Sequence, residues 1–283
     1  MDMTTSKPAL LDAAGIDAAV RANHPDYTAV LIGVQNLIPG PSTKESDALL
    51  ALAEAKAQSF LAGREPHELQ EMQAWREAFL SFGVKPREAR SSVEALLRRV
   101  TSGLPRIDRL TDVYNAVSVM RVVPIGGEDF DCYQGPARLV VATGDETFDT
   151  VVDGQPAVGN AEPGEIIWRD DIGATCRRWN WRQCVRTRLT DATTDALFII
   201  DGLGPDSQSR TESAADELIE RLAKASPSAI FTARTIAGSS RGSAPCRSSH
   251  GATTSSSAST PPPSSPAPNG HDANPAASTT SAP

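Results

Sequence analysis

Aromatic side chains, cysteines and long apolar runs are all scarce in this 283-residue sequence. Only 5% of the residues are aromatic and four are cysteines, none of them in a C-x-x-C pair or beside a histidine cluster. Cysteines scattered in this way support neither a disulfide framework nor a structural zinc site. We therefore expect reduced, buried thiols, no bound metal and no other cofactor.

No run of about 18 apolar residues is present, and Met1–Leu11 lacks the basic stretch and apolar core of a secretory signal. We therefore expect no membrane span and a cytoplasmic protein. The formal net charge of −8 argues against a sequence-independent nucleic-acid coat, because such binding depends on many cations that meet phosphates. It leaves room for a local basic face.

The composition changes near Phe231. Beyond this residue the sequence consists mainly of Ser, Thr, Pro, Ala and Gly and has almost no large apolar side chains, too few to offset the entropy lost on ordering. We predict an N-terminal extension at residues 1–25, a folded domain at 26–225 and a disordered tail at 235–283. A chain cut at Ala225 is accordingly expected to keep its melting temperature.

The first half of the chain is predicted to be mainly helical. The apolar run Tyr27–Leu37, which ends at Pro39, indicates a buried strand. After it, capping patterns and helical spacing of apolar residues predict three helices. They lie at Ser42–Leu61, from Pro66 to just before Gly83, and at Ser91–Ser102.

The second half of the chain has a different pattern of apolar residues. Between Arg109 and Asp201, short apolar runs are cut by Gly, Pro and Asp, which is typical of strands and turns. The predicted strands are Val113–Val123, Ala137–Thr143, Glu165–Trp168 and Ala196–Ile200. Thr211–Lys224 is a last amphipathic helix. Because helices and strands are segregated along the chain, the sequence favours an α+β fold.

The sequence contains few signals for catalysis. The glycine pair Gly126-Gly127 lacks the third glycine and the lysine of a phosphate-binding loop. His24 and His67 lie in the globular part without a serine or cysteine motif nearby, so no Ser-His-Asp or Cys-His hydrolase is visible. If the protein is a hydrolase, its water must be activated by the backbone, by carboxylates or by the substrate.

Arginines and tryptophans alternate in one segment that has no acidic residue between Gly173 and Thr190. The cluster consists of Arg177, Arg178, Trp179, Trp181, Arg182, Arg186 and Arg188. Guanidinium groups bind phosphates and indoles stack on bases, so this composition suits a structured RNA end or loop. Alternatively, the segment is a core strand whose arginines pair with nearby aspartates, namely Asp170, Asp171, Asp129 or Asp131.

A second basic area lies between Lys85 and Arg109 and includes Arg98 and Arg99. It is either a solvated helix face or a track for phosphates.

An ordered set of residues carries a family resemblance. It consists of a D-x-x-N-x-x-S pattern at Asp112, Asn115 and Ser118, followed by Pro124, Gly126 and Asp131. With the flanking segments between Trp75 and Leu203, this set resembles a stand-alone B3/B4 domain, the editing and tRNA-binding module of the phenylalanyl-tRNA synthetase beta chain. The resemblance implies an α+β domain with a mixed β core flanked by helices. It also implies a pocket in which the ester of a wrongly attached amino acid is hydrolysed.

The resemblance, together with the composition of the two basic areas, gives two groups of candidate site residues. The pocket candidates are Asn115, Ser118, Gly126, Gly127, Asp129, Asp131 and Asp201. The RNA-binding candidates are Arg177, Arg178, Trp179, Arg182, Arg98 and Arg99. The histidine of the synthetase domain is replaced here by Gly126 or Gly127, so its role cannot be transferred. The resemblance implies that Asp201 corresponds to the acidic residue that closes the synthetase pocket.

Two sequence-level questions stay open. Asn115 and Ser118 are predicted to lie side by side on a strand-turn segment, where they either line the pocket or hydrogen-bond to the turn at Pro124–Gly127. The function is either trans-editing, with the tRNA acceptor end or an aminoacyl-tRNA as partner, or non-catalytic recognition of RNA, an amino acid or a protein on the same fold.

Overall fold

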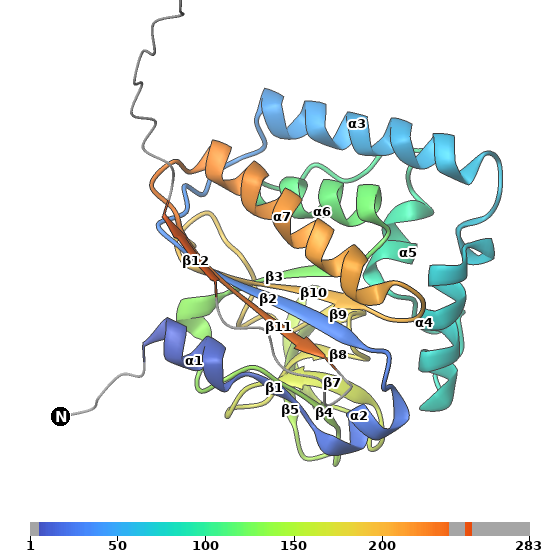
Figure 1. Ribbon diagram of the computed structural model, residues 1–283. Coiled ribbons are helices and arrows are strands. Elements are labelled where there is room, and N and C mark those ends of the chain that lie inside the picture. The colour runs from blue at the N-terminus through green and yellow to red at the C-terminus, as the bar shows by residue number, and fades with distance from the viewer. Residues whose placement is uncertain (1–5, 238–246, 251–283) are drawn as a thin grey trace, which may run out of the picture. The chain divides into compact units, whose positions relative to one another are not determined.

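The computed structural model describes residues 6–237 and 247–250, and its central feature is a five-stranded antiparallel sheet (Figure 1). The strand order is β12-β11-β2-β10-β3. Both β2 and β10 are buried at nearly every position, which explains why their sequences are continuous apolar runs. The strands are β2 (Thr28–Gln35), β3 (Ile125–Asp129), β10 (Ala196–Gly202), β11 (Ile230–Ala237) and β12 (Arg247–His250).

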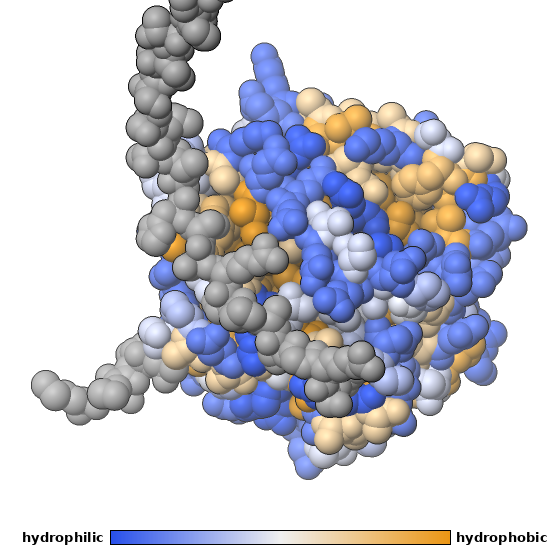
Figure 2. Space-filling model, viewed as in Figure 1, coloured by the Kyte–Doolittle hydropathy of each residue, from blue (hydrophilic) through white to orange (hydrophobic). Residues whose placement is uncertain are grey.

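Three long helices cover one face of this sheet (Figure 1). They are α3 (Lys44–Leu61), α6 (Arg109–Arg121) and α7 (Ser207–Ala225). Helix α7 packs on β2 and β10, α6 lies between α7 and β3, and α3 packs on α6. The buried positions of α7 recur at helical spacing, from Thr211 through Leu218 to Leu222. Its outward face is largely hydrophilic, as Figure 2 shows.

Helix α6 corrects one prediction, because Val113–Val123 was expected to be a strand. The helix is started by Asp108, whose carboxylate accepts hydrogen bonds from the backbone N–H of Thr111 at 2.8 Å and from its hydroxyl at 2.7 Å. Its many β-branched residues have low helix propensity, but α6 is packed between α3, α7 and β3. Tertiary packing therefore outweighs propensity here.

A second, smaller sheet lies on the opposite face of the central sheet (Figure 1). Its order is β1-β4-β7-β8-β9, and it is mixed because β1 runs parallel to β4. Its strands are β1 (Gly15–Ile16), β4 (Arg138–Val141), β7 (Ile166–Arg169), β8 (Ala174–Arg177) and β9 (Arg182–Gln183). A separate hairpin joins β5 (Thr147–Val152) to β6 (Gln155–Asn160), and the two residues at its turn, Asp153 and Gly154, both have positive φ.

The remaining helices lie at the edges of the sheets. They are α1 (Lys7–Ala13), α2 (Ala18–Asn23), α4 (Gln70–Ser81), α5 (Ser92–Leu97) and two short 3₁₀ turns, Pro66–Glu68 and Phe130–Cys132. The helix predicted to begin at Pro66 is thus divided into a 3₁₀ turn and α4, and the helix predicted at Ser91–Ser102 ends at Leu97. No helix in the described ranges is both long and apolar enough to cross a bilayer.

The predicted α+β class is confirmed, whereas the predicted domain limits differ from the structure. Helix α1 contacts β2 and β11, and β1 pairs with β4, so the described part of residues 1–25 belongs to the fold. At the other end, β11 pairs along the whole of β2 and lies beyond residue 225. Apart from the end of β11 and the strand β12, the tail predicted at 235–283 lies outside the described residues.

Candidate binding site

A pocket of about 270 Å³ lies where helices α5 and α6 meet β3, β10 and the strands β7, β8 and β9. The pairing of β3 with β10 places part of its wall. Gly126 lies opposite Ile199 and Glu128 lies opposite Leu197. Because strand side chains alternate, Gly126, Glu128 and Asp201 share one face of the sheet, and all three line the pocket. A Cβ added at Gly126 would meet nothing within 4 Å, so this glycine leaves room for a ligand.

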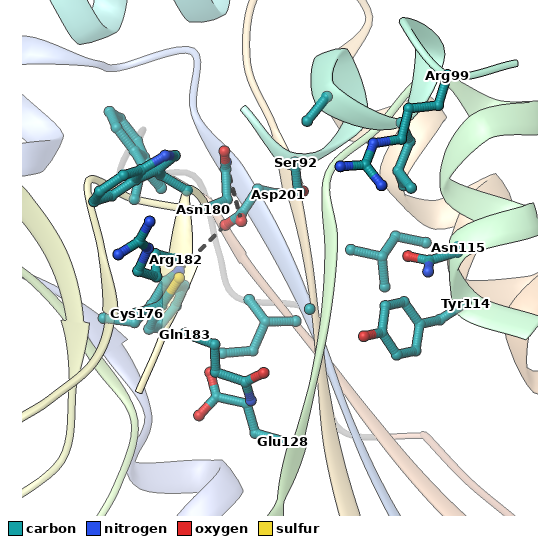
Figure 3. Close-up of a pocket in the computed structure, with 18 residues that line it drawn as sticks. Ser92, Arg99, Tyr114, Asn115, Glu128, Cys176, Asn180, Arg182, Gln183 and Asp201 are labelled. Atoms are coloured by element: carbon teal, nitrogen blue, oxygen red, sulfur yellow. Dashed lines mark hydrogen bonds between the residues drawn. The ribbon is translucent and has the colours of Figure 1, made fainter. Parts of the chain in front are cut away.

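Asp201, at the end of β10, is buried at the inner end of the pocket (Figure 3). Its Oδ1 accepts hydrogen bonds from the Tyr27 hydroxyl at 2.5 Å and from the Trp168 indole N–H at 3.3 Å. Its Oδ2 accepts one from the Asn180 amide at 3.3 Å. Burial raises the pKa of Asp201 to about 6, and the three donors oppose this rise.

Glu128 is a second buried carboxylate in the same lining. It accepts a hydrogen bond from the Tyr133 hydroxyl at 2.7 Å. Burial raises its pKa to about 7, and hydrogen bonds from Tyr133, Thr187 and Thr175 oppose the rise. Burial, together with the nearby charges of Glu128 and Asp201, also raises the pKa of Cys176 well above its ordinary value. This cysteine is therefore a neutral thiol and a poor nucleophile.

Two arginines form the rim of the pocket. Arg99 and Arg182 both line it and are exposed, and neither has a carboxylate partner among the described residues. Trp181 lies next to Arg182, and the guanidinium carbons of Arg178 and Arg182 are each 4.5 Å from the centroid of its ring. The pocket thus has an acidic inner end and a cationic, aromatic rim.

Comparison with family profiles matches residues 74–241 to the B3/4 domain. The chain belongs to this family. Among solved structures, it is similar to an N-terminal fragment of the phenylalanyl-tRNA synthetase beta-subunit from Pyrococcus horikoshii. The identity is 13% and the TM-score 0.42, and the match covers 79% of this chain and 51% of that chain. The chain therefore spans about half the length of that fragment. Comparison with curated proteins finds no match.

Six of the predicted site residues of this B3/4 domain line the pocket. They are Asn115, Gly126, Asp201, Trp179, Arg182 and Arg99. Figure 3 shows Asp201, Asn180 and Arg182 on one side, with Arg99 and Asn115 across the pocket. The predicted strand-turn placement of Asn115 is wrong, since it projects from helix α6.

The other four pocket candidates lie elsewhere. Ser118 is buried and donates a hydrogen bond to the carbonyl of Val123 at 2.6 Å, so it holds the end of α6. A Cβ at Gly127 would come within 2.9 Å of three neighbouring side chains, which makes this glycine a packing requirement. Asp129 accepts a hydrogen bond from the Thr193 hydroxyl at 2.7 Å, and Asp131 pairs with Lys7 at 2.6 Å.

Most of the predicted RNA-binding arginines have partners within the domain. Arg177 forms two hydrogen bonds with Glu165, at 2.7 and 2.9 Å, and Arg178 lies 3.6 Å from the same carboxylate. Ion pairing was the alternative expected for these arginines, but the partner is Glu165 and not an aspartate. Arg98 lies 3.6 Å from Glu65.

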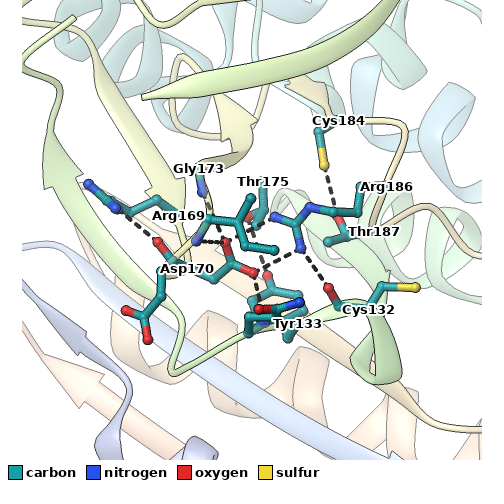
Figure 4. A network of polar contacts seen from close by, with 12 residues as sticks. Cys132, Tyr133, Arg169, Asp170, Gly173, Thr175, Cys184, Arg186 and Thr187 are labelled. Carbon is teal, nitrogen blue, oxygen red and sulfur yellow. Dashed lines mark hydrogen bonds and ion pairs between the residues drawn. The ribbon is translucent and has the colours of Figure 1, made fainter. Parts of the chain in front are cut away.

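Two further residues of this segment, Arg186 and Trp179, stabilise the fold. Arg186 forms two 2.9 Å hydrogen bonds with the buried Asp170 (Figure 4). Asp170 also accepts backbone N–H groups from Gln134, Ile172 and Gly173, so it fixes the turns beside β7. Trp179 is fully buried, with its ring centroid 5.3 Å from that of Trp75.

Sequence reasoning missed several lining residues, above all Glu128 and Asn180, and it named Trp181 only as a member of the arginine and tryptophan cluster. Glu128 could have been found from β-strand alternation, because it lies two residues after Gly126. Asn180 and Trp181 lie in the connection between β8 and β9, where no periodic pattern indicates which side chains point inward.

Proposed function

We propose that this B3/4 domain binds the aminoacyl end of a tRNA and hydrolyses the ester of a wrongly attached amino acid. The observation that carries this proposal is the polarity of the pocket. Its inner end holds the buried carboxylate of Asp201, and its rim holds Arg99 and Arg182 without carboxylate partners in the described chain. An amino acid attached to a polyanionic chain has a matching shape and charge distribution.

The size of the pocket supports a division in which the amino acid enters the pocket and the nucleotides stay outside it. Pockets for drug-sized ligands usually measure about 300–1,000 Å³, and this one, at about 270 Å³, has room for one amino-acid moiety. The nucleotides of a tRNA end would then remain outside, against the rim.

The rim has the chemistry that such nucleotides require. Guanidinium groups bind phosphate oxygens in pairs, and those of Arg99 and Arg182 are not occupied by carboxylates of the described chain. Trp181 offers an aromatic surface beside Arg182 on which a base can stack.

The proposed hydrolysis relies on orientation, because the ester is already an activated bond. Asn115 and the hydroxyl of Ser92, which has no hydrogen-bond partner in the described chain, both line the pocket and can donate to the oxygen of the tetrahedral intermediate. Glu128, with a pKa of about 7, is poised to accept a proton from the attacking water. The oxygen of the water forms the new C–O bond, the ester C–O bond breaks, and the leaving ribose oxygen takes the proton that Glu128 accepted.

One observation favours a second candidate function. Gly126, one of the two glycines at which the resemblance places the synthetase histidine, lies in the pocket, and the lining contains no histidine. The alternative is therefore a non-catalytic module that binds RNA, an amino acid or a protein.

A deacylation assay with a panel of misacylated tRNAs tests the proposal. We expect the full chain to hydrolyse at least one ester, and we expect Arg182→Gln to raise KM and Asp201→Asn to remove the preference among amino acids. Asp131→Asn, which removes a carboxylate outside the pocket, is the matched control and should behave as the wild type. Binding of tRNA without hydrolysis of any ester would support the alternative, and absence of both tRNA binding and hydrolysis would refute the proposed function.

A further inference from the structure

The buried carboxylates of this domain fall into two groups. Most have an arginine partner, and the pairs are Glu94–Arg76, Glu146–Arg169, Glu165–Arg177, Asp170–Arg186 and Glu217–Arg121. Among the described residues, Asp112, Glu128 and Asp201 are buried without a cation. Asp112 is satisfied by the Ser46 hydroxyl and by the backbone N–H of Ile107, each at 2.9 Å, and does not line the pocket. Glu128 and Asp201 both line the pocket.

A buried carboxylate without a counter-ion is unfavourable, because desolvation penalises its charge. Where two such groups line one pocket, a ligand that carries positive charge removes the penalty. The raised pKa values of Asp201 and Glu128 agree with this interpretation, since both reflect burial that no cation offsets.

Asn180 supplies the second observation. Its amide N–H₂ donates to Asp201, which fixes the orientation of the side chain. Its Oδ1 then has no hydrogen-bond partner in the described chain, although Asn180 is only 8% exposed and lines the pocket. The inner end therefore presents two neighbouring acceptors, on Asp201 and Asn180. A hydroxyl group brings a single donor, whereas a primary ammonium brings three donors and a positive charge.

The surrounding walls fit a cation as well. Trp168 and Trp179 line the same pocket and are almost completely buried, so their rings exclude water, which strengthens the attraction between a cation and the carboxylate of Asp201. At the rim, Arg99 and Arg182 repel a cation and attract an anion. A ligand with a cationic tip and an anionic outer part therefore matches the whole pocket.

We propose that the pocket takes an amino-acid side chain that ends in a primary ammonium, as in lysine or ornithine, held by Asp201 and Asn180. This rests on the proposed function, in that the amino acid enters while attached to a nucleotide. Glu128 adds negative potential to the same interior.

The test uses 3′-amide analogues of aminoacyl-adenosine, which bind but cannot be hydrolysed as esters. Calorimetry with the full chain compares lysyl, ornithyl, norleucyl and tyrosyl analogues at pH 7.5. All four carry the α-amino group, and the norleucyl side chain differs from the lysyl one by the absence of the terminal amine. We expect the lysyl or ornithyl analogue to bind at least tenfold more tightly than the norleucyl analogue.

Variants assign the preference to the inner end. Asp201→Asn should abolish the difference between the lysyl and norleucyl analogues, while Asp131→Asn should leave it unchanged. Circular dichroism verifies that each variant is folded, and Asn180→Ala, which leaves Asp201 in place, should reduce the difference if Asp201→Asn does not fold.

Equal binding of the lysyl and norleucyl analogues, or tightest binding of the tyrosyl analogue, would overturn this inference. Hydrolysis of a misacylated tRNA in the deacylation assay would then still uphold the proposed function. Conversely, a preference for the amine-bearing analogues without hydrolysis of any ester would uphold the ammonium site and refute the editing reaction.

Discussion

At the level of a single residue, Asp201 is subject to two opposite effects on the pKa of its carboxyl group. Its three hydrogen-bond donors favour the ionised form, but its burial without a cation in the described chain raises its pKa to about 6. The folded protein therefore binds a proton at Asp201 more tightly than the unfolded chain does. A residue kept in such an environment lowers stability at neutral pH, which is common where a site is prepared for a ligand.

We predict that Asp201→Asn stabilises the domain at pH 8 and not at pH 4. The stability that Asp201 contributes is fully present below its unfolded-state pKa and is lost as the pH rises through about 6, the pKa in the folded state. Each pKa unit corresponds to about 1.4 kcal/mol, so the difference between variant and wild type should reach on the order of 2–3 kcal/mol at pH 8.

Denaturant unfolding of both proteins between pH 4 and pH 8 measures this difference. Stability profiles that stay parallel over the whole range would contradict the assignment of a raised pKa to Asp201.

Asn115 and Ser118 lie one helical turn apart on α6 and are expected to behave differently on substitution. Ser118 is fully buried and donates to Val123, so Ser118→Ala should lower the free energy of unfolding by about 1–2 kcal/mol and leave ligand affinity unchanged. Asn115 faces the pocket, so Asn115→Ala should weaken ligand binding with little loss of stability. Urea titration and calorimetry separate the two effects, and a reversed pattern would show that the roles are exchanged.

At the level of elements, the connection between β8 and β9 decides where the arginine and tryptophan side chains go. Arg178 and Trp179 both have left-handed backbone conformations, with φ of 47° and 66°. Such a pair of non-glycine residues is unfavourable by itself. The complete burial of Trp179 against Tyr27 and Trp75 offsets it. The turn leaves Trp181 and Arg182 at the rim of the pocket.

This turn leads us to predict opposite phenotypes for two arginines of one cluster. Arg177→Gln leaves the buried Glu165 without its bidentate partner and should lower stability by roughly 3 kcal/mol. Arg182→Gln should leave stability unchanged, weaken tRNA binding and reduce the slope of log affinity against log salt concentration, because one phosphate contact is lost.

Arg99→Gln, at the end of α5, should affect binding as Arg182→Gln does, whereas Arg98→Gln should leave binding and stability nearly unchanged, because Arg98 lies outside the pocket and its ion pair with Glu65 is exposed. Thermal unfolding and salt-dependent binding measure both pairs. An unchanged salt slope for Arg182→Gln and Arg99→Gln alike would exclude the rim as the phosphate-binding surface.

At the level of the whole molecule, the pocket exists only because distant parts of the chain meet. Asn115 comes from a helix on one face of the central sheet, Asp201 from the end of a central strand, and Asn180 from the smaller sheet on the other face. The central sheet is completed by β11, which pairs with every residue of β2.

We therefore predict that a chain ending at Ala225 is strongly destabilised, contrary to the expectation from composition. Removal of β11 would expose the backbone and side chains along the whole of β2, which is buried in the intact domain. A chain that ends at His250 retains every strand described here and should keep the melting temperature of the full chain. Calorimetry of the two truncated chains tests this, and a native-like transition in the shorter one would refute it.

The sequence by itself determined the fold class and most elements, because these depend on local patterns. The apolar runs of β2 and β10 and the helical spacing of α3 and α7 survive in the structure with shifts of a few residues at their ends. Asp201 could be placed at the end of a strand for the same reason, and Asn115, Gly126, Arg99 and Arg182 were named from motif and composition.

Tertiary structure alone decided what local patterns do not encode. The valine-rich α6 is a helix because it is packed between other helices and a sheet, and Ser118 is structural because the chain returns to it at Val123. The partner of each arginine is likewise a matter of long-range geometry. Arg177 and Arg182 are both arginines of one cluster, and nothing in the sequence distinguishes their roles. Only the fold brings Glu165 to the first and leaves the second at the rim of a pocket whose buried carboxylates have no cation of their own in the described chain.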